Sequence, residues 1–316
     1  MDELAAPLDL QSGVVSRRQA LAAGLLPHDI RRRIRRREWT PAFAGVYVDH
    51  NGPLTWLQRG WAAVLLGWPA ALCHDSALRA SDGPGRRDHD DGRPIHIAVD
   101  RTRSVVEPAA VVVHQLADLD QKVQWNRTPP RVRIEHTVLD LAAEAPDELE
   151  AIARVANAVQ ARRTTAPRIL EALDTRTRIA RRSFLAGVLD DVAAGTCSVL
   201  EHGYLTRVER PHGLPVAERQ VMESSRGTVY RDVEYRPYGA LVELDGRLFH
   251  DSAADRDRDL DRDLDSVVDG RTTARLGWGQ VFGRPCETAV KVGRQLQRRG
   301  WVGRPQPCPE CRPGQP

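Results

Sequence analysis

One segment near the end of the chain, VYRDVEYRPYGALVELDGRLFH at 229–250, constrains the fold because it has the pattern of a β-hairpin with acids on one face. Asp232 lies on the first predicted strand, and Glu243 and Asp245 lie on the second. Successive side chains of a strand point to opposite faces, so Glu243 and Asp245 share a side and lie roughly 7 Å apart. The segment therefore predicts a sheet with an acidic face.

Two turns are compatible with this hairpin. A four-residue loop at 236–239 sets Asp232 opposite Glu243. A two-residue turn at 238–239 pairs Asp232 with Asp245 instead, but it makes the preceding proline a strand residue. Either register places like charges face to face, which destabilises a sheet unless something binds between them. A hard cation such as Mg²⁺ prefers carboxylate oxygens, so we expect a metal ion between these acids.

Composition limits the class of protein. With 316 residues the chain is long enough for two or three domains, and its net charge of +3 shows that it is not a polycation as a whole. The N-terminal sequence MDELAAPLDL lacks the cationic start of a signal peptide, and the longest apolar run, 60–73, is too short to span a bilayer. The five cysteines are scattered, which argues against a disulfide framework. We therefore expect a cytoplasmic protein.

Residues 14–50 have the pattern of a small domain with two helices and a β-hairpin. The motif Ser16-x-x-Gln19 is a capping box that can begin a helix, and Pro27 at a first helical position can begin the next helix. The segment WTPAFAGVYV at 39–48 then has the pattern of a β-wing. Two short helices followed by a wing predict a winged helix-turn-helix.

The second of these helices carries a concentrated positive charge. Between residues 17 and 38 there are eight arginines and only two acids. Such a concentration is the electrostatic footprint of nucleic-acid binding, because arginine binds phosphates and guanine edges well. We therefore predict DNA contacts from the arginines of this helix, namely Arg31, Arg32, Arg33, Arg35, Arg36 and Arg37.

The rest of the chain predicts an α/β multidomain fold. Residues 51–195 have the pattern of a mixed α/β middle region. Residues 196–302 have the order αβββαβ followed by a last helix, and the second of their three helices is a charged one at 255–268. We expect disordered tails at 1–13 and at 303–316, the second because it is rich in proline and glycine without hydrophobic periodicity.

The αβββαβ order, together with Asp232 and Glu243-x-Asp245, resembles the PD-(D/E)xK nucleases, which have the restriction-endonuclease-like fold. In particular it resembles very-short-patch-repair-like endonuclease domains, through the pieces SVLEHGYL, YRDVEY, VELDGRLFH and DRDLDRDL. The segment RQALAAGLLPHDIRRRIRRREWTPAFAGVYV resembles the winged-helix domain of AbiE-type (type IV) antitoxins. Together the two resemblances cover nearly the whole chain except its tails.

The nuclease resemblance implies roles for five residues. In such nucleases, carboxylates hold divalent metal ions at the scissile phosphate, and the ion lowers the pKa of the attacking water. The resemblance implies that Asp232 and Glu243 bind Mg²⁺ or Mn²⁺, and the acidic face of the hairpin adds Asp245 as a metal ligand. Glu201 matches the helix-borne acid that completes the site in many members, and His250 would shuttle a proton. This chain departs from the motif at its third position, which is usually lysine and is Asp245 here.

The sequence leaves the roles of several other residues open. Glu201 lies in Ser198-x-x-Glu201, itself a capping box, so it also has a structural reading. Cys308 and Cys311 form a lone C-x-x-C pair, for which Cys286 and His202 are the distant candidates to complete a zinc site. We assign structural roles to three histidines without ligand spacing, His74, His114 and His136.

Two functions follow from these patterns. We favour a DNA-binding, divalent-metal-dependent endonuclease, in which the winged helix brings the duplex and the C-terminal domain hydrolyses a phosphodiester bond. The alternative is an antitoxin-like transcriptional regulator whose nuclease-fold domain is inactive, and the missing lysine favours it. Besides DNA, a cognate toxin or a repair protein is the partner that the resemblance implies.

Overall fold

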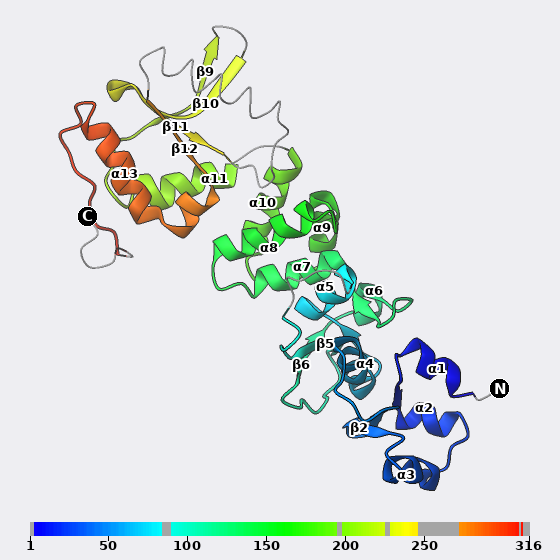
Figure 1. Ribbon diagram of the computed structural model, residues 1–316. Helices are drawn as coiled ribbons and strands as arrows, with labels where there is room; N and C mark the ends of the chain where they lie inside the picture. The colour runs from blue at the N-terminus through cyan, green and yellow to red at the C-terminus, as the bar shows by residue number, and fades with distance from the viewer. Residues whose placement is uncertain are drawn as a thin grey trace. The chain divides into compact units, whose positions relative to one another are not determined.

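The computed structural model of the chain describes residues 3–83, 90–194, 198–224, 228–245, 272–309 and 311. Contacts divide the chain into two compact units, residues 1–141 (unit 1) and 142–316 (unit 2). Both units combine helices with small sheets, so the fold is mixed α/β (Figure 1). His250 and the helix predicted at 255–268 lie outside the described residues. None of the described helices combines the length and the apolarity that a bilayer crossing requires.

Unit 1 begins with three short helices and a three-stranded sheet. In chain order these elements are α1 Ala5–Leu10, β1 Val14–Ser16, α2 Arg17–Ala22, α3 Pro27–Arg35, β2 Thr40–Phe43 and β3 Val46–Val48. The sheet has the order β1-β3-β2, with antiparallel pairing on both sides of β3. The capping box at the start of α2 is confirmed, because Gln19 N–H donates to Ser16 Oγ (3.2 Å) and Ser16 N–H donates to Gln19 Oε1 (3.0 Å).

The N-terminal residues belong to this packed structure. We expected a disordered tail at 1–13, but Leu4 is completely buried, and Leu8 packs against the same core. That core includes Val15, Ile30 and Trp39, which come from β1, from α3 and from just before β2. Two short helices and a small sheet offer little apolar surface of their own, so the preceding helix adds what the core needs.

A second sheet follows in unit 1. The elements are α4 Trp56–Gly67, β4 Ala71–Leu72, α5 His74–Asp82, β5 Ile95–Asp100, β6 Val111–Leu116, α6 Leu119–Lys122, β7 Val123–Gln124, β8 Arg131–Val132 and α7 Ile134–Ala143. The sheet has the order β6-β5-β4-β8-β7. At the end of α4 the helix comes so close to β5 that a Cβ on Gly67 would lie 2.9 Å from Ile97 Cδ1. A glycine is therefore needed there for close packing.

Unit 2 consists of helices followed by a four-stranded sheet with helices on one side. Its elements are α8 Glu148–Gln160, α9 Ala166–Asp174, α10 Arg182–Ala194, α11 Ser198–Gly203, the π-helix η1 Tyr204–Glu209, β9 Glu218–Ser224, β10 Thr228–Tyr235, the 3₁₀ turn η2 Arg236–Tyr238, β11 Ala240–Leu244, β12 Thr272–Leu276, the π-helix η3 Gly279–Gly283 and α13 Pro285–Gln297. The sheet has the order β12-β11-β10-β9. Strands β9, β10 and β11 pair antiparallel, and β12 is parallel to β11. Figure 1 shows α11 and α13 on the same side of this sheet.

The hairpin of β10 and β11 has the register of the four-residue loop. Val233 pairs with Val242 and Tyr235 pairs with Ala240. The loop consists of η2 and of Gly239, whose φ of +54° is in the left-handed region that glycine adopts without strain. Continued by one residue, this register sets position 232 opposite position 243. The four-residue alternative is therefore confirmed, and the two-residue turn is not formed.

Two tyrosines meet in the core under this sheet. Tyr204 from η1 and Tyr235 from β10 are both buried, and their hydroxyl oxygens are 2.8 Å apart. The Tyr235 hydroxyl also donates to Glu209 Oε2 at 3.3 Å. Burial is the main cause that raises the pKa of Tyr235 far above its usual value, and the neighbouring Tyr204 and Glu209 raise it further. Tyr235 therefore stays neutral and can act as a hydrogen-bond donor at any ordinary pH.

We predict that Tyr235→Phe lowers the free energy of unfolding of the chain by about 1–3 kcal/mol, because buried polar groups lose a hydrogen-bond partner. Urea denaturation followed by circular dichroism measures this loss. The matched control is Tyr238→Phe, in the solvent-accessible turn of the same hairpin, which should change the unfolding free energy by less than about 0.5 kcal/mol. Equal losses in the two variants would contradict the role given to the buried hydroxyl.

Candidate functional site

The acids of the predicted metal site lie at one end of β11. Glu243 is the fourth residue of this strand, and its side chain is 26 % exposed. Its Oε2 lies 3.3 Å from Nη2 of Arg275, the residue beside it in the parallel register with β12. Asp245 directly follows β11, where its N–H donates to Leu276 O at 2.8 Å. Arg275 therefore offsets the charge of Glu243, a partner that the hairpin pattern does not reveal.

The other predicted catalytic residues are placed less completely. Glu201 is half-buried on α11. Among the described side chains, Glu201, Glu243 and Asp245 do not form a group whose oxygens all lie within 4.8 Å of one another. Position 232 belongs to β10, but the Asp232 side chain and the whole of His250 lie outside the described residues. The described acids of the predicted site are therefore Glu201 on α11 and, at the ends of the paired strands β11 and β12, Glu243 and Asp245.

The basic helix α3 buries one face and exposes arginines on the others. Ile30 is fully buried, and Ile34 packs against the same core. The Leu26 N–H donates to Asp29 Oδ2 (3.0 Å), which caps the start of the helix. This hydrogen bond is the largest cause that lowers the pKa of Asp29. The nearby charges of His28, Arg32 and Arg33 lower it further. The carboxylate therefore stays ionised well into acidic conditions, where it continues to cap α3.

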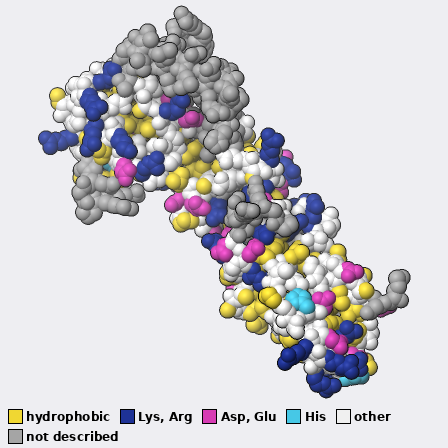
Figure 2. Space-filling view, in the orientation of Figure 1, with side chains coloured by type: hydrophobic (Ala, Val, Ile, Leu, Met, Phe, Trp, Pro, Cys, Tyr) yellow, Lys and Arg dark blue, Asp and Glu magenta, His cyan; other side chains and the backbone are white. Residues whose placement is uncertain are grey.

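The six predicted DNA-binding arginines divide into two sets. Three of them have partners, because Arg32 pairs with Asp29 (2.8 Å), Arg36 lies 3.8 Å from Glu38, and Arg33 lies 5.1 Å from the ring centre of Trp39. The others are exposed, and in the described part of the chain no acid pairs with them; they are Arg31, Arg35 and Arg37. Figure 2 shows Lys and Arg side chains gathered over α3. The exposed set is the one available for phosphates.

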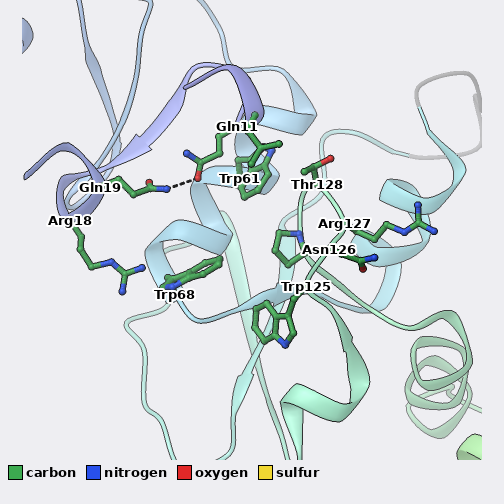
Figure 3. A pocket seen from close by; sticks show the side chains of 11 residues that line it. Gln11, Arg18, Gln19, Trp61, Trp68, Trp125, Asn126, Arg127 and Thr128 are labelled. Carbon is green, nitrogen blue, oxygen red and sulfur yellow. Dashed lines mark hydrogen bonds between the residues drawn. The ribbon is translucent and has the colours of Figure 1, made fainter. Parts of the chain in front are cut away.

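A pocket of about 390 Å³ lies in unit 1 between α2 and the end of α4 (Figure 3). It is lined by Leu10, Gln11, Arg18, Gln19, Trp61, Trp68, Trp125, Asn126, Arg127, Thr128 and Pro130. Trp68 and Trp125 meet edge to face with ring centres 6.0 Å apart, and Arg18 lies 5.8 Å from the Trp68 ring centre. Ring faces beside a guanidinium group are surfaces on which a planar group can stack. No sequence pattern predicted this pocket, because Trp125 lies far along the chain from Trp61 and Trp68.

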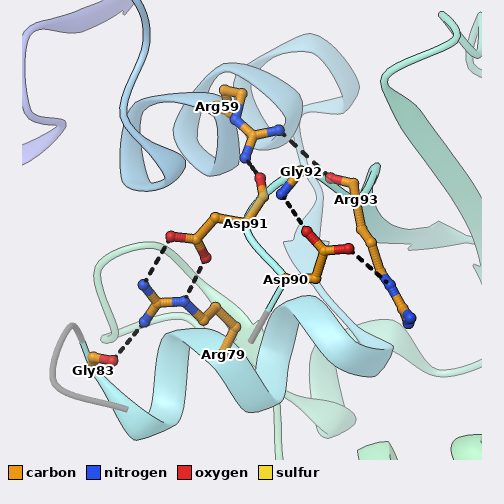
Figure 4. A network of polar contacts seen from close by, with 7 residues as sticks. All are labelled: Arg59, Arg79, Gly83, Asp90, Asp91, Gly92 and Arg93. Atoms are coloured by element: carbon orange, nitrogen blue, oxygen red, sulfur yellow. Dashed lines mark hydrogen bonds and ion pairs between the residues drawn. The ribbon is translucent and has the colours of Figure 1, made fainter. Parts of the chain in front are cut away.

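A cluster of charges beside α5 has a structural role. Asp91 Oδ1 lies 2.9 Å from Arg79 Nε, and the Asp91 carbonyl accepts from Arg59 on α4 (Figure 4). The hydrogen bond to Asp91 raises the pKa of Arg79. Asp90 accepts from Gly92 N–H at 2.9 Å, which tightens the turn before β5. These contacts hold residues 90–93 against two helices and leave no free cation in the cluster as drawn in Figure 4.

Two groups of histidine and cysteine residues come together among the described side chains. The first is Cys73, His74 and His114, whose two rings stack with centres 3.7 Å apart. His114 Nε2 is also 2.9 Å from His96 Nδ1. Imidazole lone pairs lie in the ring plane, so stacked rings do not aim them at one point. This group therefore agrees better with the structural role assigned to His74 and His114 than with a metal site.

The second group is His212, Cys286, Cys308 and Cys311 in unit 2. It contains the C-x-x-C pair and Cys286, as the sequence suggested, but its histidine is the buried His212, whereas the suggested His202 is exposed on α11. Burial, followed by hydrogen bonds with Cys311 and Cys308, raises the pKa of the Cys286 thiol to about 12. Residues 212 and 286 carry no spacing signal, so only the fold reveals the group.

Comparison with known proteins adds no family to these observations. No protein-family model matches the chain, and no curated protein is significantly similar to it in sequence.

Proposed function

We propose that the protein is a DNA-binding, divalent-metal-dependent endonuclease that hydrolyses phosphodiester bonds at the sheet of unit 2. The observation that carries the proposal is the hairpin register, which continues to set position 232 opposite Glu243. Asp245 lies two residues further along and therefore on the same face as Glu243. Arg275 offsets the charge of Glu243, but three acids at such positions still favour the binding of a further cation.

The topology of unit 2 supports this proposal. A helix, α11, precedes three antiparallel strands, and β12 then pairs parallel to β11. The order of these described elements agrees with the resemblance to PD-(D/E)xK nucleases, and the helix expected between β11 and β12 lies outside the described residues. The acids would then stand on the central strands, β10 and β11, as that resemblance requires. Fold alone does not establish an activity, so the site residues must be tested directly.

The donor chemistry fits Mg²⁺ or Mn²⁺. The candidate ligands, Asp232, Glu243 and Asp245, are carboxylates, and Glu243 is open enough to reach a ligand. When bound, such an ion polarises a phosphoryl oxygen and lowers the pKa of the attacking water. Glu243 would exchange its contact with Arg275 for the ion.

Two further residues have proposed roles in the same site. Glu201 would complete the acid set from α11, and His250 would accept or return a proton, since imidazole titrates near neutral pH. The departure from the nuclease motif at Asp245 means that no lysine stands beside Glu243 in sequence. Arg275 supplies a positive charge at this place, but a guanidinium stays protonated and cannot act as a base.

The first part of unit 1 is proposed to bind the duplex as a winged helix-turn-helix. Helices α2 and α3 are followed directly by the β2–β3 hairpin, which would be the wing. In helix-turn-helix proteins the second helix enters the major groove, and here α3 carries the exposed arginines. A cytoplasmic location and a repair protein as partner would agree with this function.

A second candidate function is transcriptional regulation. The contact between Glu243 and Arg275 shows that the acidic face already has a positive partner in the protein. Together with the missing lysine, this favours an antitoxin-like regulator whose nuclease-fold unit no longer cleaves DNA and instead binds a cognate toxin. Such a protein would bind its operator equally well with or without Glu243.

We predict that the purified chain nicks supercoiled DNA when Mg²⁺ or Mn²⁺ is present and that Glu243→Gln reduces nicking to background. The substitution keeps the shape of the side chain but removes the charge that a cation needs. The matched control is Glu218→Gln, an exposed acid of β9 in the same sheet, which should leave nicking unchanged. Nicking that survives in Glu243→Gln would refute the endonuclease, and a wild type that binds DNA without cleaving it would favour the regulator.

We also predict that Arg31→Ala/Arg35→Ala weakens DNA binding and reduces the salt dependence of the binding constant. Each lost phosphate contact lowers the slope of log Kobs against log[salt] by about 0.9, so the slope should fall by about 2 in magnitude. Fluorescence anisotropy at several salt concentrations measures the slope. The control is Arg101→Ala/Arg133→Ala, two exposed arginines of unit 1 outside α3. If both pairs change the slope equally, α3 is not the DNA-binding element.

A further inference from the structure

Four groups that can bind a metal converge in unit 2 from three distant parts of the chain. His212 follows η1 and is completely buried, and Cys286 is buried in the first turn of α13. Cys308 and Cys311 are half-buried in the C-terminal segment, which Figure 1 shows running back along α13. The three sulfur atoms and one imidazole nitrogen all lie within 4.8 Å of one another.

The distances among these atoms are those of a tetrahedral zinc site. Zinc binds sulfur at about 2.3 Å and imidazole nitrogen at about 2.0–2.1 Å, which gives tetrahedral edges of roughly 3.8 Å between sulfurs and 3.6 Å between sulfur and nitrogen. The Sγ atoms of Cys286 and Cys308 are 3.6 Å apart, as are those of Cys308 and Cys311. Cys311 Sγ lies 3.6 Å from His212 Nε2. The cysteines are free thiols, so no disulfide accounts for this convergence.

The surroundings of the four groups orient them toward one point. His212 Nδ1 lies 2.9 Å from the carbonyl oxygen of Val208, so this nitrogen carries the proton and Nε2 keeps its lone pair toward the thiols. The Cys308 N–H donates to Cys311 Sγ at 3.2 Å, and a hydrogen bond of this kind stabilises a thiolate. A metal-binding histidine usually makes such a second contact through its other ring nitrogen.

The C-terminal segment is held in place although it forms no helix or strand. Its backbone pairs with unit 2 where Gln306 N–H donates to the His212 carbonyl (2.8 Å). The Gln297 side chain donates to the Gly303 carbonyl at 2.8 Å, and Gly293 on α13 leaves room for Pro305, whose Cγ would lie 2.4 Å from a Cβ there. The disordered tail expected at 303–316 is therefore corrected for residues 303–309 and 311, which pack on the unit through these contacts.

We propose that His212, Cys286, Cys308 and Cys311 bind one structural zinc ion that fastens the C-terminal segment to unit 2. Three thiolates and one imidazole in a tetrahedral arrangement are a ligand set for zinc, because soft sulfur ligands select it over Mg²⁺ or Ca²⁺. All four positions are taken by protein ligands, so the ion has no open position for water and acts on stability. This site is separate from the carboxylates of β11 and does not depend on the proposed nuclease activity.

The test is the metal content of the purified full-length chain. Elemental analysis after dialysis should find one zinc per wild-type chain and almost none in Cys311→Ser or in Cys308→Ser. The matched controls are Cys73→Ser, which removes a buried cysteine from the other histidine and cysteine group, and His202→Ala, which removes the exposed histidine. Both controls should keep their zinc. Zinc that is lost from Cys73→Ser and kept in Cys311→Ser would overturn the assignment.

Two further measurements keep the proposal falsifiable if a cysteine variant fails to fold. Wild-type chain loaded with Co²⁺ in place of zinc should show the visible absorption of tetrahedral cobalt with thiolate ligands. A chelator should also lower the melting temperature of the wild type, because metal binding contributes directly to folding. A folded wild type that takes up neither metal, or whose cysteines prove to be linked as a disulfide by mass spectrometry, would refute the site.

Discussion

The alternation of side chains along β10 and β11 is the constraint on which the proposed site depends. One face of this hairpin sends Val233, Tyr235 and Val242 into the core of unit 2. The same alternation forces Glu243 to the other face, where solvent and Arg275 can reach it. A slip of one residue would bury the acids and expose the core, so the packing that stabilises the sheet also fixes the position of the acidic face.

Local patterns predicted the elements that local contacts determine. The capping box of Ser16 and Gln19 is formed as expected, and the hairpin has the loop at 236–239, one of the two turns that the sequence allowed. Each of these features involves residues only a few positions apart. The register of the hairpin follows from that loop, and with it the placement of Glu243. The three antiparallel strands and the last helix of unit 2 were predicted in their order for the same reason, because their hydrophobic periodicity is contained within single segments.

Contacts between distant residues could not be predicted in this way. Arg275 reaches Glu243 only because β12 pairs with β11. No residue near Glu243 in the sequence indicates this contact. The same limit explains the histidine of the cysteine group, where exposed His202 was as eligible from sequence as buried His212. The role of a single arginine is also hidden in the sequence, since Arg103 uses its guanidinium to hold the carbonyls of Gly67 and Trp68.

The backbone contact between Gln306 and His212 also determines when unit 2 can finish folding during protein synthesis. Its sheet gains β12, and its core gains α13, only after the first three strands have been made. The helices α8 to α10 can collapse early, but the residue that pairs with His212 leaves the ribosome only after all four strands and α13 have been made. Until then the half-made unit exposes apolar surface, and this is the period in which the nascent chain most needs protection by chaperones.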